Sequence, residues 1–237
     1  MQIPRNDWDR YIKRLSAINK KAADTMRDWI SVNGYDSVEE LVYWASGLTQ
    51  RYGEAAAALA CEMYDAIAEA SGVSVAAAVP AEVYPEGYIA KAVRDTLDIA
   101  PTTVPNLVGR MVKQAGADTM LQNAARDGAQ FAWVPHGDTC AFCITLASRG
   151  WQYMSKKALK NGHAEHIHSN CDCEYAIRFK DTDGVAGYDP HKYQDMYYGA
   201  EGGTPTDRIN AMRRERYAVD KDHINARKRE LYAEKND

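Results

Sequence analysis

Four cysteines within a 34-residue stretch constrain this chain more than any other feature. They form two pairs, Cys140 with Cys143 and Cys171 with Cys173, while Cys61 stands alone in an alanine-rich segment and is interpreted as a packing residue. No basic and then apolar leader opens the chain, so we expect a protein made and used inside a cell. In a reducing cytosol, paired cysteines indicate a metal site before they indicate disulfides. The alternatives are four buried thiols or two disulfides, which would need an oxidising compartment.

The spacing of the cysteine pairs suits zinc. Residues 140–143 read C-x-x-C, and residues 168–173 read H-x-x-C-x-C. Zinc takes four ligands in a tetrahedron, with Zn–S bonds of about 2.3 Å. A C-x-x-C turn brings two thiolates to one point, and a second pair completes the shell. We therefore predict one zinc ion bound by Cys140, Cys143, Cys171 and Cys173. In the alternative ligand set, His168 replaces Cys171 or Cys173.

A group of histidines and a glutamate lies between the two pairs. His163-Ala164-Glu165 matches the H-x-E of zinc deaminases, but in those enzymes it precedes the cysteine pair and here it follows. This reversal favours a solvated loop, or side chains that orient the thiolates, over a catalytic site. His136, just before the first pair, is a further candidate for such an orienting role.

Motifs of common enzyme classes are missing from the sequence. It contains no G-x-x-x-x-G-K-[ST] loop, no G-x-G-x-x-G fingerprint and no G-x-S-x-G elbow. We predict no catalytic residues and no cofactor other than zinc.

Helical periodicity dominates the first 130 residues and predicts a mainly α chain. Apolar residues from Trp8 to Ile30 recur every three or four positions, which indicates one long amphipathic helix that ends at Asn33-Gly34. Further helices are expected on both sides of a proline-containing break at 73–85, which we interpret as a linker between helical regions. Their expected ranges are 36–48, 54–70, 87–97, 106–114 and 118–130.

After residue 130 the period changes to that of strands. Short strands are expected over 131–134 and 151–154, and a half-buried strand over 173–180, with a short helix at 156–161. The fold class is therefore mainly α: a helical N-terminal region, a small α+β zinc-stapled module and a C-terminal helical tail. The predicted domains are an N-terminal helical region (1–72), a second helical region (73–130), the zinc-binding module (131–182), and a Tyr- and Gly-rich arm with a final helix (183–237).

Charge and hydropathy restrict the partners. With 29 basic and 33 acidic residues, the chain has a net charge of −4 and no overall electrostatic affinity for DNA. Residues 210–229 nevertheless carry seven basic and three acidic side chains, which indicates either a solvated helix face or a contact with nucleic acid or an acidic partner. The longest apolar run, 55–61, is far shorter than the roughly 20 residues that cross a bilayer. We expect no membrane and no small-molecule substrate.

The two cysteine boxes together resemble the signature of the Mu F-like minor head (minor capsid) proteins of tailed bacteriophages. The first box, residues 138–143, reads Asp-Thr-Cys-Ala-Phe-Cys, and the second resembles the H-P-N-C-R-C box of that family, with Ser169 in place of proline and Asp172 in place of arginine. The flanking residues, Val134-Pro135, Leu146 to Trp151 and Tyr153, resemble a variant found in phages of actinobacteria. The resemblance covers Trp133 to Tyr175.

This resemblance implies a structural, non-enzymatic component of the virion head, assembled in the host cytoplasm. Its partners would be the portal or the major capsid protein, and packaged DNA through the basic tail; some relatives are thought to influence DNA ejection. Other relatives are described as capsid maturation proteases. The rival hypothesis is therefore a zinc-dependent enzyme, a hydrolase, nuclease or maturation protease, that uses His163, Glu165 or His166. A structural zinc site is closed by four protein ligands, whereas a catalytic one keeps a position for water.

Overall fold

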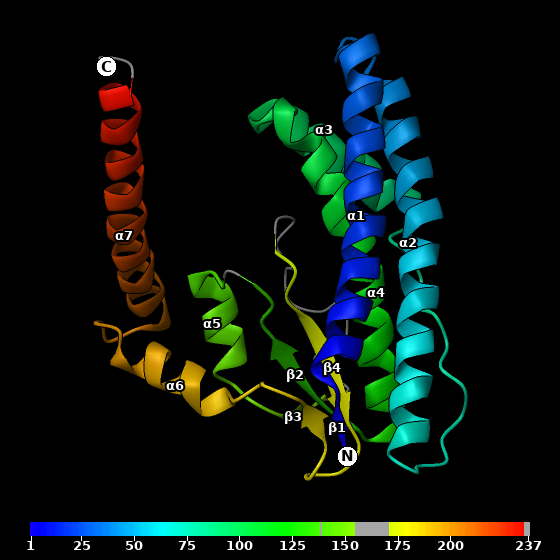
Figure 1. Ribbon diagram of the computed structural model, residues 1–237. Helices are drawn as coiled ribbons and strands as arrows, with labels where there is room; N and C mark the ends of the chain where they lie inside the picture. Colours follow the sequence, from blue (N-terminus) through cyan, green and yellow to red (C-terminus); the bar gives the residue numbers. More distant parts are fainter. Residues whose placement is uncertain (138, 155–170, 235–237) are drawn as a thin grey trace. The chain divides into compact units, whose positions relative to one another are not determined.

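The chain is mainly α-helical, as the sequence predicts. The computed structural model describes residues 1–137, 139–154 and 171–234. They form two compact units: Unit 1 comprises Met1–Gly137 and Trp151–Tyr188, and Unit 2 comprises Asp138–Gly150 and Asp189–Asp237 (Figure 1). These units cut across the four predicted ranges, because the predicted module 131–182 contributes residues to both. No helix in the described part of the chain is long and apolar enough to span a bilayer.

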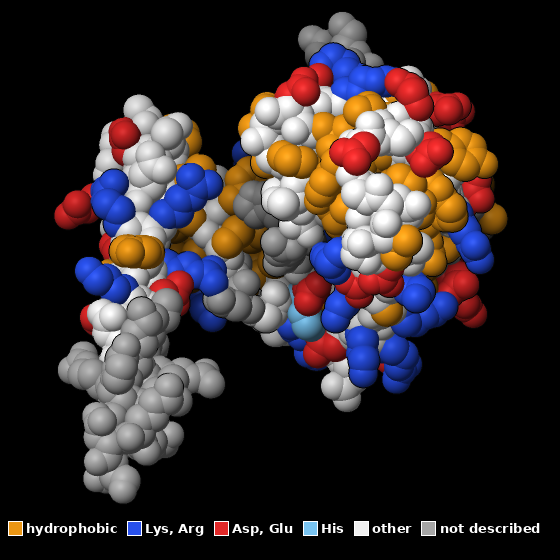
Figure 2. Space-filling view, turned by 90° about the horizontal axis from the view of Figure 1, so that it is seen from above, with side chains coloured by type: hydrophobic (Ala, Val, Ile, Leu, Met, Phe, Trp, Pro, Cys, Tyr) orange, Lys and Arg blue, Asp and Glu red, His pale blue; other side chains and the backbone are white. Residues whose placement is uncertain are grey.

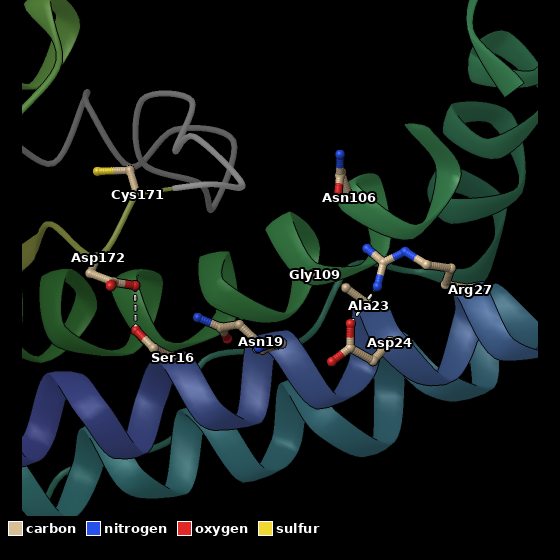
Figure 3. A pocket seen from close by; sticks show the side chains of 10 residues that line it. Ser16, Asn19, Ala23, Asp24, Arg27, Asn106, Gly109, Cys171 and Asp172 are labelled. Atoms are coloured by element: carbon tan, nitrogen blue, oxygen red, sulfur yellow. Dashed lines mark hydrogen bonds and ion pairs between the residues drawn. The ribbon is translucent and has the colours of Figure 1, made fainter. Parts of the chain in front are cut away.

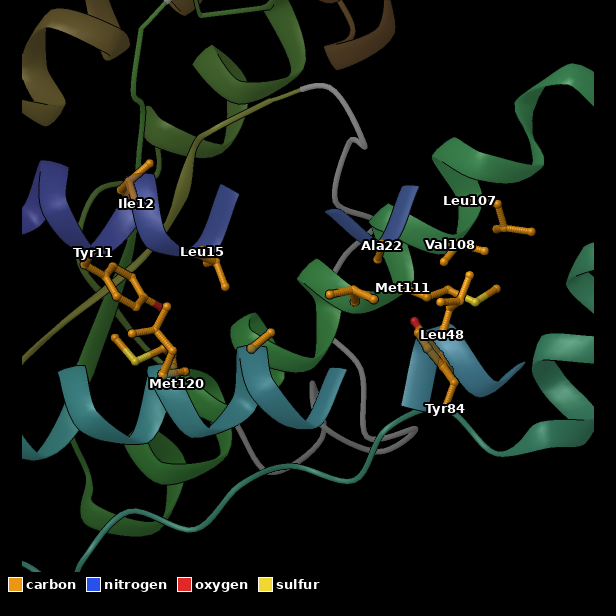
Figure 4. Packing of buried hydrophobic residues seen from close by; sticks show 14 of the residues in the cluster. Tyr11, Ile12, Leu15, Ala22, Leu48, Tyr84, Leu107, Val108, Met111 and Met120 are labelled. Carbon is orange, nitrogen blue, oxygen red and sulfur yellow. The ribbon is translucent and has the colours of Figure 1, made fainter. Parts of the chain in front are cut away.

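Helices make up most of Unit 1. Helices α1, α2 and α4 lie side by side. Helix α3 follows the extended segment of residues 73–85 that comes after α2 (Figure 1). Their shared core is lined by large apolar side chains from all three long helices (Figure 4). The bounds are α1 Arg5–Asn33, α2 Val38–Ala70, α3 Glu86–Ile99, the short 3-10 helix η1 Pro101–Thr103 and α4 Val104–Asp127.

Helix α1 confirms the predicted amphipathic stripe. Trp8, Ile12 and Met26 are almost fully buried on one face, while lysines and arginines occupy the other. The helix ends where predicted, because Gly34 adopts a left-handed φ of 70° and its N–H donates to Ile30 O at 2.8 Å. The next helix starts with Ser37 as its cap, one residue after the predicted Asp36, and the Ser37 hydroxyl accepts from Glu40 N.

Two pairs of predicted helices are in fact single helices. Residues 38–70 form the continuous α2 and residues 104–127 the continuous α4. Gly53 and Gly116, which lie between the predicted ranges, do not end these helices, because each allows a close approach to a neighbour. A Cβ on Gly53 would lie 3.0 Å from Val83, and one on Gly116 would lie 3.3 Å from Leu15 Cδ1. A helical glycine costs about 1 kcal/mol relative to alanine, which such packing offsets.

The predicted break after α2 is an extended strap that packs on helices. Backbone N–H groups of Val79 and Ala81 donate to the side chains of Asn123 and Thr119, both at 2.9 Å. Ala78 N donates to Asp65 at 2.8 Å. The strap therefore belongs to Unit 1, and the interpretation as a linker between separate helical regions is wrong.

A small antiparallel sheet completes the core of Unit 1. Its strands are β2 Gln130–Val134, β3 Gln152–Tyr153 and β4 Glu174–Arg178, in the order β3-β2-β4. These strands lie where the sequence predicts them, but β4 is buried on both faces rather than half-buried: Glu174, Ala176 and Ile177 are all fully buried. The reason is that α4 and α2 also pack against β4. The helix predicted over 156–161 lies outside the described residues.

The N-terminus joins this unit through a second, parallel pair of strands. β1 Gln2–Ile3 pairs with β5 Gly184–Val185, and the terminal amino group contacts Asp183. Strands of two residues carry no periodicity, so no sequence pattern indicates this pair.

The described residues of Unit 2 form three helices, α5 Ala141–Ala147, α6 Pro190–Gly199 and α7 Pro205–Glu234. Its small core combines residues of all three helices with Ala200, the C-cap of α6: Ala141, Ile144, Tyr197, Ala200, Ala211 and Met212. The predicted final helix is confirmed and is longer than 210–229. The prediction of a Tyr- and Gly-rich arm is wrong in part, because residues 190–199 of this segment form helix α6. Asp189 caps α6 by accepting from His191 N at 2.9 Å, and Pro190 occupies its first position.

Candidate metal centre

The first cysteine pair lies at the start of a helix. Cys140 is the N-cap of α5, and Cys143 lies in its first turn. A three-residue spacing puts two side chains on one face of a helix, so the C-x-x-C is presented by a helical turn rather than by an open loop. Cys143 is fully buried and Cys140 is partly exposed.

The second pair lies just before β4. Cys173 is fully buried and Cys171 is partly exposed. Two backbone N–H groups point at the sulfurs: His136 N donates to Cys173 Sγ at 3.4 Å, and Cys173 N donates to Cys171 Sγ at 3.3 Å. Hydrogen bonds donated to a sulfur favour its thiolate form, which is the form that binds metals.

Three of the five predicted ligands lie together. The sulfurs of Cys143, Cys171 and Cys173 are all within 4.8 Å of one another and can hold a metal ion. Tetrahedral Zn–S bonds of about 2.3 Å put neighbouring sulfurs about 3.8 Å apart, a spacing compatible with the 4.8 Å limit of this group. Cys140 is outside this group of three, and His168 lies outside the described residues. The complete four-ligand shell therefore stays a prediction.

A buried lysine lies next to the second pair. Lys113, on α4, is 3% exposed, and its Nζ donates to the carbonyl oxygen of Cys171. The same Nζ lies 5.7 Å from the centre of the Trp133 ring. A lysine is buried in this way only when its ammonium has partners. Lys113, on α4, thus holds the backbone at the candidate ligand Cys171 through the Cys171 carbonyl.

A buried carboxyl accompanies this lysine. Glu174 is fully buried, and burial raises its pKa to about 7, against the opposing effect of Lys113. Its Oε1 accepts from Tyr175 N at 2.9 Å, whereas Oε2 has no hydrogen-bond partner among the described residues. The carboxyl also raises the pKa of the buried Tyr11 hydroxyl, for which burial is the larger cause. Glu174, Lys113 and Tyr11 are therefore buried polar side chains that influence one another next to the Cys171–Cys173 segment.

Neither Lys113 nor Glu174 was predicted from the sequence. Both are distant in sequence from the groups they face, so no local spacing reveals them. A signal did exist for Lys113, because it interrupts a stretch of α4 in which Met111, Val112 and Ala115 are buried. A lysine in a helix segment that is buried on all sides must have a buried partner.

His136 contributes through its backbone rather than its ring. Its N–H reaches Cys173 Sγ, while its Nε2 lies 3.3 Å from Asp9 Oδ1 on α1. The predicted orienting role thus has a structural basis. The other histidines considered, His163, His166 and His168, lie with Glu165 outside the described residues.

A polar groove of about 450 Å³ lies beside Cys171, between α1 and α4 (Figure 3). Asp172, which replaces the arginine of the Mu F-like box, turns toward α1, where Ser16 Oγ donates to its Oδ1 at 2.6 Å. Asp24 and Arg27 pair at the far end. Asp172 therefore ties the cysteine segment to α1.

Comparison with known sequences shows what kind of protein carries this centre. The sequence model described as "VG15 protein" matches residues 2–200. The chain belongs to the VG15 protein family. This is a family of viral and phage proteins, and the match covers both cysteine pairs together with α1 to α6. No curated protein and no solved structure gives a significant match.

Proposed function

We propose that this member of the VG15 family is a structural minor component of a phage head, built around a zinc-stapled cysteine cluster. The observation that carries the proposal is the pair of cysteine boxes, which resemble those of Mu F-like minor head proteins and occur here in a chain of a viral family. The resemblance is limited to residues 133–175, whereas the family match covers most of the chain.

Zinc is the metal that suits this donor set best. Thiolates are soft ligands that select zinc among the abundant divalent ions. Cys143, Cys171 and Cys173 supply three of them, and Cys140 or His168 would supply the fourth. A shell closed by four protein ligands leaves no position for water, so the ion would hold segments together and would not catalyse a reaction.

Elemental analysis of the full chain, purified without added metal, tests the site. We expect close to one zinc per chain, lost in Cys143→Ser, Cys171→Ser and Cys173→Ser and retained in Cys61→Ser, which is the matched control. The Cys140→Ser and His168→Ala variants identify the fourth ligand. A wild-type protein that is metal-free and equally stable with and without a chelator would exclude a structural metal.

The proposed partners are the portal and the major capsid protein. Proteins of this type would be incorporated at low copy number while the head assembles in the host cytoplasm, and would act afterwards in the virion. The test is quantitative mass spectrometry of purified heads and mature virions, with co-purification on an immobilised portal. We expect a few copies per head and retention on the portal. A chain abundant in the infected cell but missing from both particles would contradict the proposal.

A further inference from the structure

The ends of α1 and α2 that meet at the turn 34–37 leave large apolar side chains exposed. Val32 is 83% exposed on α1, and Tyr43 and Trp44 are 72% and 42% exposed on α2. The partly buried Trp29 of α1 packs on Trp44, with ring centres 6.0 Å apart. We call Trp29, Val32, Tyr43 and Trp44 the aromatic tip. Figure 2 looks onto this end of Unit 1 and shows hydrophobic side chains exposed among charged ones.

The packing of α1 on α2 does not require these side chains to be exposed. The contact between the two helices is filled by other apolar residues, among them the buried Ile30 and Leu41. Positions 40, 43, 44 and 47 of α2 are all exposed and form one face, by helical spacing. Gly47 leaves open space in this face beside the two rings. Exposed tryptophan and tyrosine on such an open face are typical of the residues that anchor a partner protein.

The junction between the helices holds the aromatic tip in place. Gly34 ends α1 with a left-handed φ of 70°. At the start of α2, Ser37 Oγ accepts from Glu40 N at 3.5 Å. From α3, Arg94 Nη2 donates to both carboxylate oxygens of Glu39, each at 3.0 Å. A surface that is already ordered loses less conformational entropy when a partner binds.

The charge around the aromatic tip is of one sign. Residues 28–50 contain four acidic side chains and no lysine or arginine. One of the four is the carboxylate paired with Arg94 of α3. The other three, Asp28, Asp36 and Glu40, are exposed, and no ion pair links them to a described residue. Since residues three or four positions apart on a helix are neighbours, Asp28 and Glu40 lie beside the exposed apolar side chains.

We propose that the aromatic tip binds a basic segment of a partner protein, in which lysine or arginine side chains accompany apolar ones. The faces of tryptophan and tyrosine rings attract cations, and the neighbouring carboxylates attract the same groups. Val32 and the rings supply apolar contact area. The same negative charge opposes binding of a second aromatic tip, of nucleic acid or of an anionic bilayer. The inference goes beyond the proposed role in the head and does not depend on it.

The test measures binding of a defined cationic probe to the full chain. The probe is a labelled amphipathic peptide of about five helical turns, with arginine on one face and leucine on the other. A second peptide carries glutamine in place of arginine. Both are titrated by fluorescence anisotropy at low and high salt, and circular dichroism verifies that every variant is folded.

Two double variants of equal charge test the carboxylates. Asp28→Asn/Glu40→Gln changes the acidic residues beside the aromatic tip, and Glu54→Gln/Asp195→Asn changes two exposed acidic residues on other helices. We expect the first variant to bind the arginine peptide about three- to tenfold more weakly than wild type at low salt, with a smaller difference at high salt. The second variant should bind like wild type. Equal affinities of the two variants would overturn the proposal.

Two tyrosine variants test the aromatic rings. Tyr43→Leu removes a ring from the aromatic tip but keeps an apolar side chain, and Tyr153→Leu does the same at a tyrosine that is 68% exposed on β3. We expect Tyr43→Leu to bind the arginine peptide about two- to fivefold more weakly and Tyr153→Leu to bind like wild type. A glutamine peptide that binds as tightly as the arginine peptide would overturn the proposal. Self-association of the wild type in sedimentation that Tyr43→Leu abolishes would also overturn it, because the occupant would then be a second copy of the chain.

Discussion

Lys113 shows how a single buried charge can support the candidate metal centre. Its Nζ donates to the carbonyl of Cys171 and interacts electrostatically with the buried Glu174, so it connects α4 with the segment that carries two candidate ligands. These partners are separated from it by 58 residues or more in sequence. Candidate ligands could be proposed from the sequence, because metal chemistry restricts their type and spacing, and three of them lie close together. Their supporting residues could not, because only the folded chain brings them near.

Replacing Lys113 with methionine should therefore destabilise the protein. Methionine fills similar space but leaves the Cys171 carbonyl without its donor and Glu174 without its cation. We expect a loss of about 2 kcal/mol in the free energy of unfolding, measured by urea denaturation. Lys21→Met is the control. Lys21 lies on the exposed face of α1, so its replacement should change the free energy of unfolding little. Equal free energies of unfolding of the two variants would show that Lys113 does not stabilise the folded protein.

A second cluster of charged and polar side chains joins the ends of α2 and α4. Asp127 accepts from Tyr64 Oη at 2.8 Å and from Arg126 Nε at 2.7 Å. Arg126 also donates to Ala76 O at 2.7 Å and to Ala77 O at 3.0 Å in the strap. The hydrogen bonds from Arg126 lower the pKa of Asp127 below its ordinary value of 3.8, those from Tyr64 add to this, and burial opposes it.

This cluster predicts a defined pH dependence. Because the folded-state pKa of Asp127 is depressed, its stabilising effect is complete above pH 3.8 and is lost as the pH falls through the lowered value. Tyr64→Phe removes one donor and should cost about 1 kcal/mol at pH 7, with a smaller difference from wild type near pH 3. Urea unfolding at both pH values measures this. Tyr153→Phe, at a 68% exposed tyrosine, should show no such dependence, and a Tyr64→Phe deficit that stays constant with pH would refute the role of Asp127.

At the scale of elements, the sequence predicted where helices occur better than where they end. Amphipathic periodicity reflects which face is buried, so α1 and α3 were located closely. The expected ranges left gaps between 48 and 54 and between 114 and 118, where Gly53 and Gly116 in fact lie against neighbouring segments. A glycine can end a helix, or it can allow another segment to pack closely against the helix. Which of the two occurs depends on tertiary contacts. α6 could have been found from Asp189-Pro190, a cap followed by proline at the first helical position.

Gly109 offers a test of this principle in α4. A Cβ there would lie 3.2 Å from both Ala23 Cβ and Asn19 O on α1. Gly109→Ala should therefore destabilise the protein by about 1–3 kcal/mol through overpacking. Gly47→Ala is the matched control, because Gly47 is an exposed helical glycine with open space around its Cβ position; it should stabilise by up to about 1 kcal/mol. Thermal unfolding distinguishes the two signs, and stabilisation by both variants would mean that α1 and α4 do not need close approach at Gly109.

At the scale of the whole molecule, the predicted zinc module is not a separate body in Unit 1. Val134 of β2 and Ala176 and Ile177 of β4 belong to the same buried cluster as the side chains of α1, α2 and α4. The sequence could show that the period changes after residue 130, because periodicity is local. It could not show that the strands after this change complete the core of the helices before it, since that contact is set by the three-dimensional packing.

A shared core predicts that the strands and helices of Unit 1 unfold together. Ile177→Ala removes a fully buried side chain and should cost about 2–5 kcal/mol. Native-state hydrogen exchange should then show the same decrease in protection for amides of α1 and α4 as for β2 and β4, because one cooperative transition exposes them all. Ile99→Ala, at an isoleucine that is 86% exposed, is the matched control and should leave these amides unchanged. Loss of protection in the strands alone, with α1 and α4 unaffected, would instead mean that the cysteine-bearing strands form an independent folding unit.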